Sequence, residues 1–109
     1  TMTDQRLRQI KIKTGIVKRL AKEECTYKTE TKQQEEKIER LKAEAADEYR
    51  HHKSSEVLQE SKMMIHDSHR RLVAAHGALV QLLETEADLD ESEEYKEAQN
   101  ILHSVKLDA

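Results

Sequence analysis

The most restrictive feature of this chain is how little it contains that could stop a helix. Its 109 residues include no proline and two glycines, and neither phenylalanine nor tryptophan occurs. Sheets and tight turns rely on turn-forming, β-branched and aromatic residues, so this composition disfavours strands. Charged residues make up 38% of the chain and the mean hydropathy is -0.93. The sequence therefore predicts long, largely solvent-exposed helices that share a narrow apolar seam.

The same composition excludes several classes of function. A narrow seam is too small to enclose a deep small-molecule pocket, so we expect no catalytic site and no cofactor. The net charge of -3 provides no general basic field for nucleic acid or an anionic membrane. No apolar run approaches the roughly 20 residues of a membrane span, and we expect no leader peptide. The single Cys25 cannot form an internal disulfide, which fits a reducing, cytoplasmic location.

Heptad spacing predicts a first helix over residues 4–45. Its seam contains apolar residues at both ends and polar residues in the middle, where we expect weaker packing. The seam positions are Ile10, Val17, Leu20, Glu24, Tyr27, Thr31, Gln34, Ile38, Leu41 and Ala45.

A second heptad pattern predicts a helix over residues 49–86. Its seam positions are Leu58, Ser61, Ile65, Ser68, Leu72, Ala75, Leu79, Leu82, Glu86 and Leu89. The phase of this pattern slips by one residue relative to the first, which would turn a continuous helix by about 100°. We therefore predict a turn within residues 46–55, with Asp47, Ser54 and Ser55 as candidate N-caps.

A third helix is predicted over residues 91–106 from the spacing of Tyr95, Ala98, Leu102 and Val105. An acidic stretch precedes it, in which Asp90 and Glu93 stand three apart, like an N-cap and its returning carboxylate. The three patterns together predict an all-α, antiparallel up-down-up three-helix bundle with coiled-coil-like packing. We expect one domain over residues 1–109, with two long helices and one shorter C-terminal helix.

The distribution of charge supports this topology. From Thr1 to Lys22 the chain has seven basic residues and one acidic residue, whereas residues 84–109 contain nine acidic residues and two lysines. An up-down-up bundle places these oppositely charged segments side by side. It also offsets the unfavourable position of cations near a helix N-terminus. A parallel two-chain coiled coil would instead bring two basic ends together.

Several long blocks of the sequence resemble the tubulin-binding cofactor A family, also called tubulin-specific chaperone A. These blocks are RQIKIKTGIVKRL (8–20), KQQEEKIERLKAE (32–44), LQESKMMI (58–65), RRL (70–72), EEYKEA (93–98) and SVKLDA (104–109). The resemblance implies a small cytoplasmic, cytoskeleton-associated three-helix protein without enzymatic activity. It implies capture of β-tubulin released from the cytosolic chaperonin, which is held for further tubulin-folding cofactors that build the α/β heterodimer.

The chain departs from the family pattern at two points. His66 stands where the pattern has proline, and residues 45–47 lack the glycine expected in the first connection. Without the proline we expect a straighter second helix. Neither departure removes a charge or a candidate contact residue, so the implied function is unaffected.

Candidate metal ligands and reactive groups are sparse. His66 and His69 lie three apart and His76 lies two turns beyond His69, but no acidic or thiol ligand completes a set. We predict solvated imidazoles rather than a metal site, and the same for His51 and His52. Cys25 is interpreted as a small space-filling residue rather than a reactive thiol. The basic N-terminal segment of residues 1–22 has no aromatic residue for stacking, so nucleic-acid binding is not expected.

Residues outside the seams are the candidates for partner binding. Met63 lies on the face opposite the seam and Met64 on its flank, and methionine adapts to partners of imperfect shape. A core stripe wider than two positions per heptad would instead absorb Met64, Ile12 and Ile16. The other candidates are the charged Glu35 and Glu36, which also fit a merely solvated face. The polar mid-section completes the set with Tyr27, Thr31 and Gln34.

Two functional hypotheses remain at this stage. The first is a monomeric or weakly self-associating bundle that binds β-tubulin by surface complementarity. The second is a coiled-coil scaffold or adaptor that assembles through its own heptad seam. Heptads alone do not separate them, whereas the phase slips, the charge asymmetry and the family resemblance favour the first.

Overall fold

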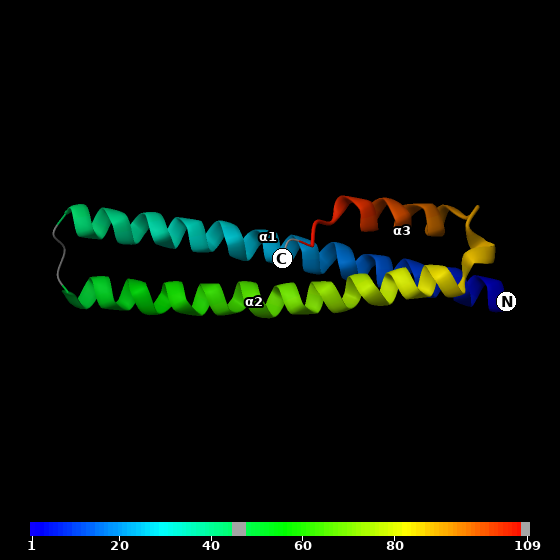
Figure 1. The fold of residues 1–109 in the computed structure, drawn as a ribbon, viewed down its shortest axis with the longest axis horizontal. Coiled ribbons are helices and arrows are strands. Elements are labelled where there is room, and N and C mark those ends of the chain that lie inside the picture. The colour runs from blue at the N-terminus through cyan, green and yellow to red at the C-terminus, as the bar shows by residue number, and fades with distance from the viewer. Residues whose placement is uncertain (45–47, 108–109) are drawn as a thin grey trace. The chain divides into compact units, whose positions relative to one another are not determined.

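A computed structural model describes residues 1–44 and 48–107, and these residues form helices without any strand (Figure 1). The elements are α1 (Met2–Ala43), α2 (Glu48–Thr85), the 3-10 helix η1 (Ala87–Leu89) and α3 (Glu93–Ser104). The predicted all-α, three-helix fold is confirmed. Each α-helix begins and ends within two residues of the bounds expected from the heptad patterns. None of the described helices is both long and apolar enough to cross a membrane.

The start of α2 corrects two of the predicted N-caps. Ser54 and Ser55 lie inside α2, which is already helical from Glu48, and Asp47 lies outside the described residues. Ser54 is buried instead, and its backbone carbonyl accepts a hydrogen bond from the Gln34 side chain at 3.0 Å. Ser54 stands one heptad before Ser61, so it continues the second seam toward the N-terminus of α2.

The predicted capping of α3 was also wrong. Its N-cap is Ser92 rather than Asp90: the Ser92 Oγ accepts a hydrogen bond from the Tyr95 backbone N–H at 3.1 Å. The same hydroxyl donates to the Leu89 carbonyl at 2.7 Å, which ties the start of α3 to the end of η1. Asp90 is instead the C-cap of η1. Because this 3-10 helix precedes α3, α3 begins two residues later than predicted.

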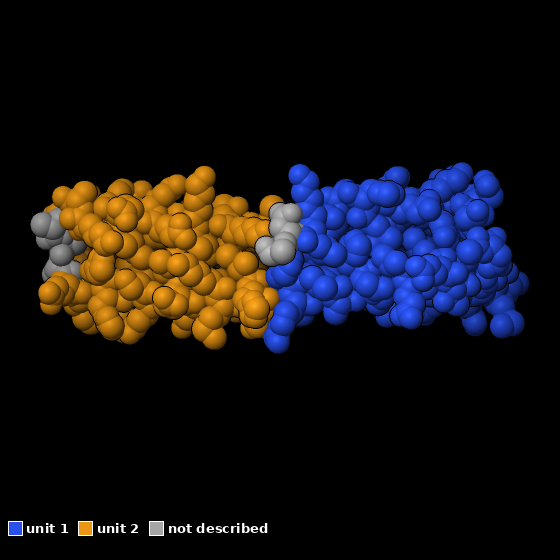
Figure 2. All heavy atoms as spheres, in the orientation of Figure 1, with its two compact units in different colours: residues 1–22, 69–109 blue, residues 23–68 orange. Residues whose placement is uncertain are grey.

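The described contacts divide the chain into two compact units (Figure 2). Unit 1 contains Thr1–Lys22 and His69–Ala109, and unit 2 contains Glu23–Ser68. Unit 1 therefore includes the first half of α1, the second half of α2 and all of α3. Unit 2 is a pair of helical segments, the second half of α1 and the first half of α2. The two units differ sharply in what they bury.

Unit 1 holds the apolar core. Residues from all three helices form one buried cluster, which consists of Ile10, Val17, Leu20, Leu72, Leu79, Leu83, Tyr95 and Ala98. Ile10, Leu79 and Ala98 are completely excluded from solvent. Seven of these residues stand at predicted seam positions, whereas Leu83 was missed because the heptad register selects its neighbour Leu82. The third helix widens the buried stripe of α2, which brings Leu83 into the core.

Tyr95 anchors α3 to α2 within unit 1. Its side chain is 8% exposed, and its hydroxyl donates a hydrogen bond of 3.0 Å to the Leu83 carbonyl, one of the last backbone acceptors of α2. A buried tyrosine needs a partner for its hydroxyl, and a helix C-terminus has carbonyls without intrahelical donors. This contact fixes the return of α3 along α2.

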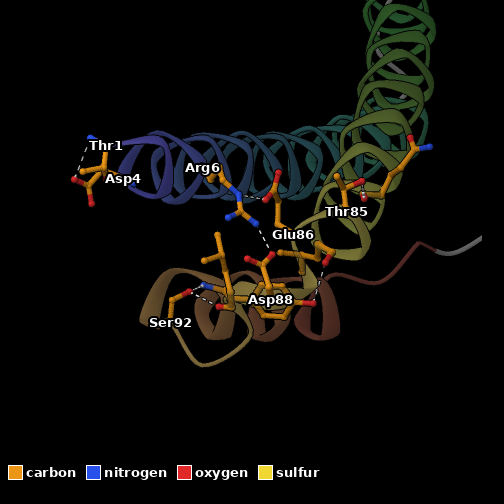
Figure 3. Close-up of polar contacts among 11 residues, drawn as sticks. Thr1, Asp4, Arg6, Thr85, Glu86, Asp88 and Ser92 are labelled. Atoms are coloured by element: carbon orange, nitrogen blue, oxygen red, sulfur yellow. Dashed lines mark hydrogen bonds and ion pairs between the residues drawn. The ribbon is translucent and has the colours of Figure 1, made fainter.

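A charge cluster joins α1 to the end of α2 and η1. The Arg6 guanidinium donates from Nε to Glu86 and from Nη2 to Asp88, and Figure 3 shows its side chain pointing between the two carboxylates. Along the same unit, Lys18 Nζ lies 3.7 Å from the Glu97 carboxylate of α3. The basic start of α1 thus lies beside the acidic segment that follows α2, as the charge distribution predicted.

Shortening a core side chain tests the unit 1 cluster. Leu72→Ala is expected to lower the free energy of unfolding by about 2–4 kcal/mol, because Leu72 is 2% exposed and its removal leaves a cavity. The neighbouring Val73→Ala is the control: Val73 is 43% exposed, so little destabilisation is expected. Chemical denaturation followed by circular dichroism measures both, and equal losses would contradict the assignment of the core.

A pH titration tests the charge cluster. The hydrogen bond from Arg6, together with its positive charge, lowers the pKa of Asp88 below the usual 3.8. The stabilisation from this carboxylate is therefore present above that value and is lost as the pH falls through the lowered pKa. Asp88→Asn should reduce the melting temperature at neutral pH, and its difference from the parent should vanish in acid.

The control for this titration is Asp90→Asn, which removes the same charge from the same connection at a carboxylate that has no partner in the described chain. Its melting temperature should stay close to that of the parent at neutral pH. Equal effects of the two substitutions would mean that net charge, and not the contact with Arg6, stabilises the connection.

Candidate interaction surface

Unit 2 buries more polar than apolar side chains, whereas Thr14 is the one polar residue among the buried described residues of unit 1. Its buried polar residues are Glu24, Thr31, Ser54 and Ser68, and we call this set the polar seam. The buried apolar residues of unit 2 are Ile38 and Leu41. Glu24 is 5% exposed and forms an ion pair of 3.0 Å with Lys28 one turn away. Weak packing through the middle of the first seam was expected from these polar residues.

Two hydroxyl groups of the polar seam have no hydrogen-bond partner within the described chain. They are the Oγ1 of Thr31 and the Oγ of Ser68, whose residues are 6% and 1% exposed. A buried hydroxyl without a partner costs about 1–3 kcal/mol. Unit 2 is therefore held less firmly than the apolar cluster of unit 1, and local opening in it costs less.

The residues predicted for partner binding in the middle of α1 lie wholly or partly between α1 and α2. Thr31 is buried, and the Gln34 side chain donates its amide hydrogen to the Ser54 carbonyl across the two helices. Tyr27 is half-buried. Tyr27 and Gln34 are both partly exposed, whereas Thr31 is buried between α1 and α2.

Glu35 and Glu36 lie on the outer side of α1 and are exposed. They line an open groove of about 740 Å³ in unit 2, whose other walls carry lysine, arginine and glutamate and whose apolar residues are Ile38 and Leu58. The remaining lining residues are Lys32, Glu39, Arg40 and Lys42. Charges of both signs around two apolar side chains form a surface suited to a mixed polar and apolar partner.

Met63 and Met64 belong to the exposed apolar surface of unit 2. Met63 is 66% exposed and Met64 39%, so the wider core stripe does not absorb either of them. Val57 is 47% exposed one heptad before Met64, and the Lys53 ammonium lies 5.8 Å from the centre of the exposed Tyr49 ring. Unit 2 thus presents adaptable apolar side chains next to charges along α2.

The histidines and the cysteine lie apart from any organised site. In the described ranges, no group of three His, Cys, Asp or Glu residues could hold a metal ion. His66 is exposed, and the half-buried His76 places its Nε2 3.4 Å from the Leu102 carbonyl. Cys25 is exposed, which overturns its interpretation as a space-filling residue: the position next to the buried Glu24 faces solvent.

Comparison with known proteins covers nearly the whole chain. A family model described as "Tubulin binding cofactor A" matches residues 5–102. A Gallus gallus protein named "Tubulin-specific chaperone A" is 66% identical over 108 residues, which are 99% of this chain and 100% of that protein.

Two solved structures resemble the described fold. One is titled "human tubulin chaperone cofactor a", with a TM-score of 0.82, 58% identity, and coverage of 92% of this chain and 97% of that one. The other is tubulin folding cofactor A from Arabidopsis thaliana, also at a TM-score of 0.82, with 34% identity and coverage of 93% and 95%.

A pair of serine substitutions tests the weakness of the polar seam. Ser68→Ala removes a buried hydroxyl without a partner, so we expect a gain of up to about 1 kcal/mol in the free energy of unfolding. Ser92→Ala makes the same chemical change at the N-cap of α3 and should cost about 1 kcal/mol. Denaturant titration compares them, and destabilisation by both variants would show that the Ser68 hydroxyl is satisfied.

Proposed function

Since the chain belongs to the tubulin binding cofactor A family, we propose that it captures β-tubulin after release from the cytosolic chaperonin. It holds the captured chain for the further cofactors that assemble the α/β-tubulin heterodimer. The observation that carries this proposal is the match over residues 5–102, which covers all of α2 and most of α1 and α3. As a member of this family the protein is a chaperone cofactor and not an enzyme. We place its action in the cytoplasm, in contact with the pool of unassembled tubulin.

The contact surface that we propose lies in unit 2. Met63 and Met64 present polarizable side chains that tolerate an irregular partner, as a folding intermediate would be. The groove beside Glu35 and Glu36 supplies charges that select and orient the partner. Tyr27 contributes its exposed part, and Thr31 and Gln34 set the spacing of the two helices below this surface.

The mostly polar interior of unit 2 supports the proposal that its surface binds the partner. A surface that adapts to a partner must be able to shift, and its supporting seam contains two unpartnered hydroxyls. Small rearrangements of α1 against α2 in this unit cost little, because few apolar contacts would be lost. Unit 1, with its dense apolar cluster, provides the stable part of the chain.

The scaffold hypothesis finds less support. Self-assembly through the heptad seam needs that seam to be open to a second chain, but Ile10, Leu72 and Leu79 are buried within one chain. We therefore propose a monomer, or at most weak self-association. A sedimentation mass of two or more chains at micromolar concentration would instead support the scaffold.

Replacing an exposed methionine tests the contact surface. Met63→Ser should leave helicity and melting nearly unchanged, because the side chain is 66% exposed, yet weaken β-tubulin capture by about 1 kcal/mol or more. Capture is measured by pull-down of β-tubulin freshly released from chaperonin, with α-tubulin as the comparison. The matched variant Val73→Ser removes an exposed apolar side chain from α2 within unit 1 and should leave capture intact.

The outcomes separate partner from surface. Equal capture of α- and β-tubulin by the parent protein would contradict the β-tubulin assignment. If the Met63→Ser variant is as stable as the parent and still captures β-tubulin preferentially, Met63 is not part of the contact surface. Charge reversal at Glu35 and Glu36 is a second test of the surface. If these residues contact a basic patch, the reversed variant should associate with β-tubulin more slowly, and its association rate should depend less on salt.

A further inference from the structure

Gly15 lies in the interior of α1, and no contact within the described residues requires a glycine there. It is exposed, and a Cβ added there would meet no atom within 4 Å. Glycine inside a helix is less favourable than alanine, because it loses more backbone freedom on folding. Close approach of another backbone is one condition that favours glycine, and no described part of this chain makes that approach at Gly15.

The residues around Gly15 form a distinctive surface. Arg8, Ile12 and Gly15 stand four and three residues apart, so they lie on one stripe of α1, with Lys11 beside them. We call these four residues the α1 outer face. Ile12 is 45% exposed although it is apolar. It also lines a groove of about 570 Å³ in unit 1, together with Arg8, Met2 and Leu82.

The cations of this face are not used by the fold. In the described part of the chain neither Arg8 nor Lys11 has an ion-pair partner, whereas Arg6 is held by Glu86 and Asp88. Lys18, one turn past Gly15, pairs with Glu97 at 3.7 Å. The fold therefore pairs Arg6 and Lys18 with carboxylates and leaves Arg8 and Lys11 as the cations of the outer face.

The acidic residues of α3 restrict where an anionic partner can lie. Glu93, Glu94 and Glu97 form one wall of a groove of about 500 Å³ whose other wall includes Lys11 and Gly15. They repel an acidic partner from that side. The favourable side of the outer face is the one toward Arg8, where the apolar groove with Met2, Ile12 and Leu82 also lies.

We propose that the α1 outer face binds an acidic amphipathic helix of a partner protein, which crosses α1 at Gly15. The missing side chain at Gly15 lets the two backbones approach, the apolar side of the incoming helix covers Ile12, and its carboxylates meet Arg8 and Lys11. A nucleic acid fits less well, because residues 1–22 contain no aromatic side chain on which bases could stack. This docking site lies in unit 1 and does not depend on the surface proposed for β-tubulin.

The decisive variant is Gly15→Ala, because the two readouts move in opposite directions. Alanine fits without contact in the free protein, so the melting temperature should rise by about 2–6 °C. The added methyl group would separate the two helices, so partner affinity should fall by about tenfold. Gly77→Ala is the matched control: Gly77 is also exposed, a Cβ there also meets nothing within 4 Å, and no cation lies three or four residues from it.

The probe is a labelled synthetic helix of about 15 residues built from leucine and glutamate with helical periodicity. Its binding to the full chain is measured by fluorescence anisotropy at low salt, beside a scrambled peptide of the same composition and a single-stranded DNA. We expect the amphipathic peptide to bind best, Gly15→Ala and the double variant Arg8→Glu with Lys11→Glu to lose about tenfold, and Gly77→Ala to bind like the parent.

Three results would overturn the proposal. The first is binding of the scrambled peptide or of the DNA as tightly as the amphipathic peptide, which would reduce the face to a simple charge effect. The second is unchanged peptide affinity in Gly15→Ala. The third is a dimer of the parent chain that Gly15→Ala dissociates, since the occupant would then be a second copy. None of these results bears on β-tubulin capture, which Met63→Ser tests separately.

Discussion

The three-helix apolar cluster of unit 1 is the constraint on which the rest of the structure depends. This chain has few large apolar residues, and most of those it buries lie where three helices meet, around Leu72, Leu79 and Tyr95. Two helices alone form a seam, whereas a third helix encloses it from another side. The contacts that hold α3 in place, the Tyr95 hydroxyl on Leu83 and the Ser92 cap, therefore decide where stability resides.

The polar interior of unit 2 is consistent with its construction from segments of α1 and α2, since α3 belongs to unit 1. Its two helical segments pair through Glu24, Thr31, Ser54 and Ser68, with a direct side-chain bond from Gln34 to the backbone of Ser54. Such a seam specifies how the helices align but contributes little burial, because hydroxyls and a carboxylate occupy positions that leucine would fill in a tighter pair. The chain thus combines a firm unit with one that yields more easily. A chain with one adaptable and one stable unit suits a protein whose proposed partner is incompletely folded.

Ion pairs connect α1 to the end of α2 and to η1 within unit 1. The basic start of α1 lies against the acidic end of α2 and η1, where Arg6 satisfies two carboxylates at once. Paired groups of this kind fix the register of α1 within unit 1 and relieve the repulsion within each charged segment. Arg8 and Lys11, which have no ion-pair partner within residues 1–44 and 48–107, then influence what the outside of this unit can attract.

Much of this architecture could be predicted from the order of residues. The heptad spacing predicted the three helices and seven of the eight core residues. It could do so because burial on one side of a helix imposes the helical period on the sequence. The polar middle of the first seam was visible for the same reason, and so was the contact between the basic and acidic segments. The sequence blocks that resemble the tubulin binding cofactor A family indicated membership of that family from the sequence alone. The exposed Met63 could likewise be placed by its phase.

The remaining features were decided by tertiary structure. Leu83 joins the core because α3 packs on that side of α2, and no local pattern in α2 reveals its presence. Ser92 displaced Asp90 as the cap because η1 changed the path of the chain before α3. Whether Thr31 and Gln34 face a partner or the neighbouring helix depends on the pairing across unit 2, which sequence spacing does not encode. Periodicity determines which side of a helix is buried, whereas the contacts between helices determine how wide that side is and which polar groups are satisfied within it.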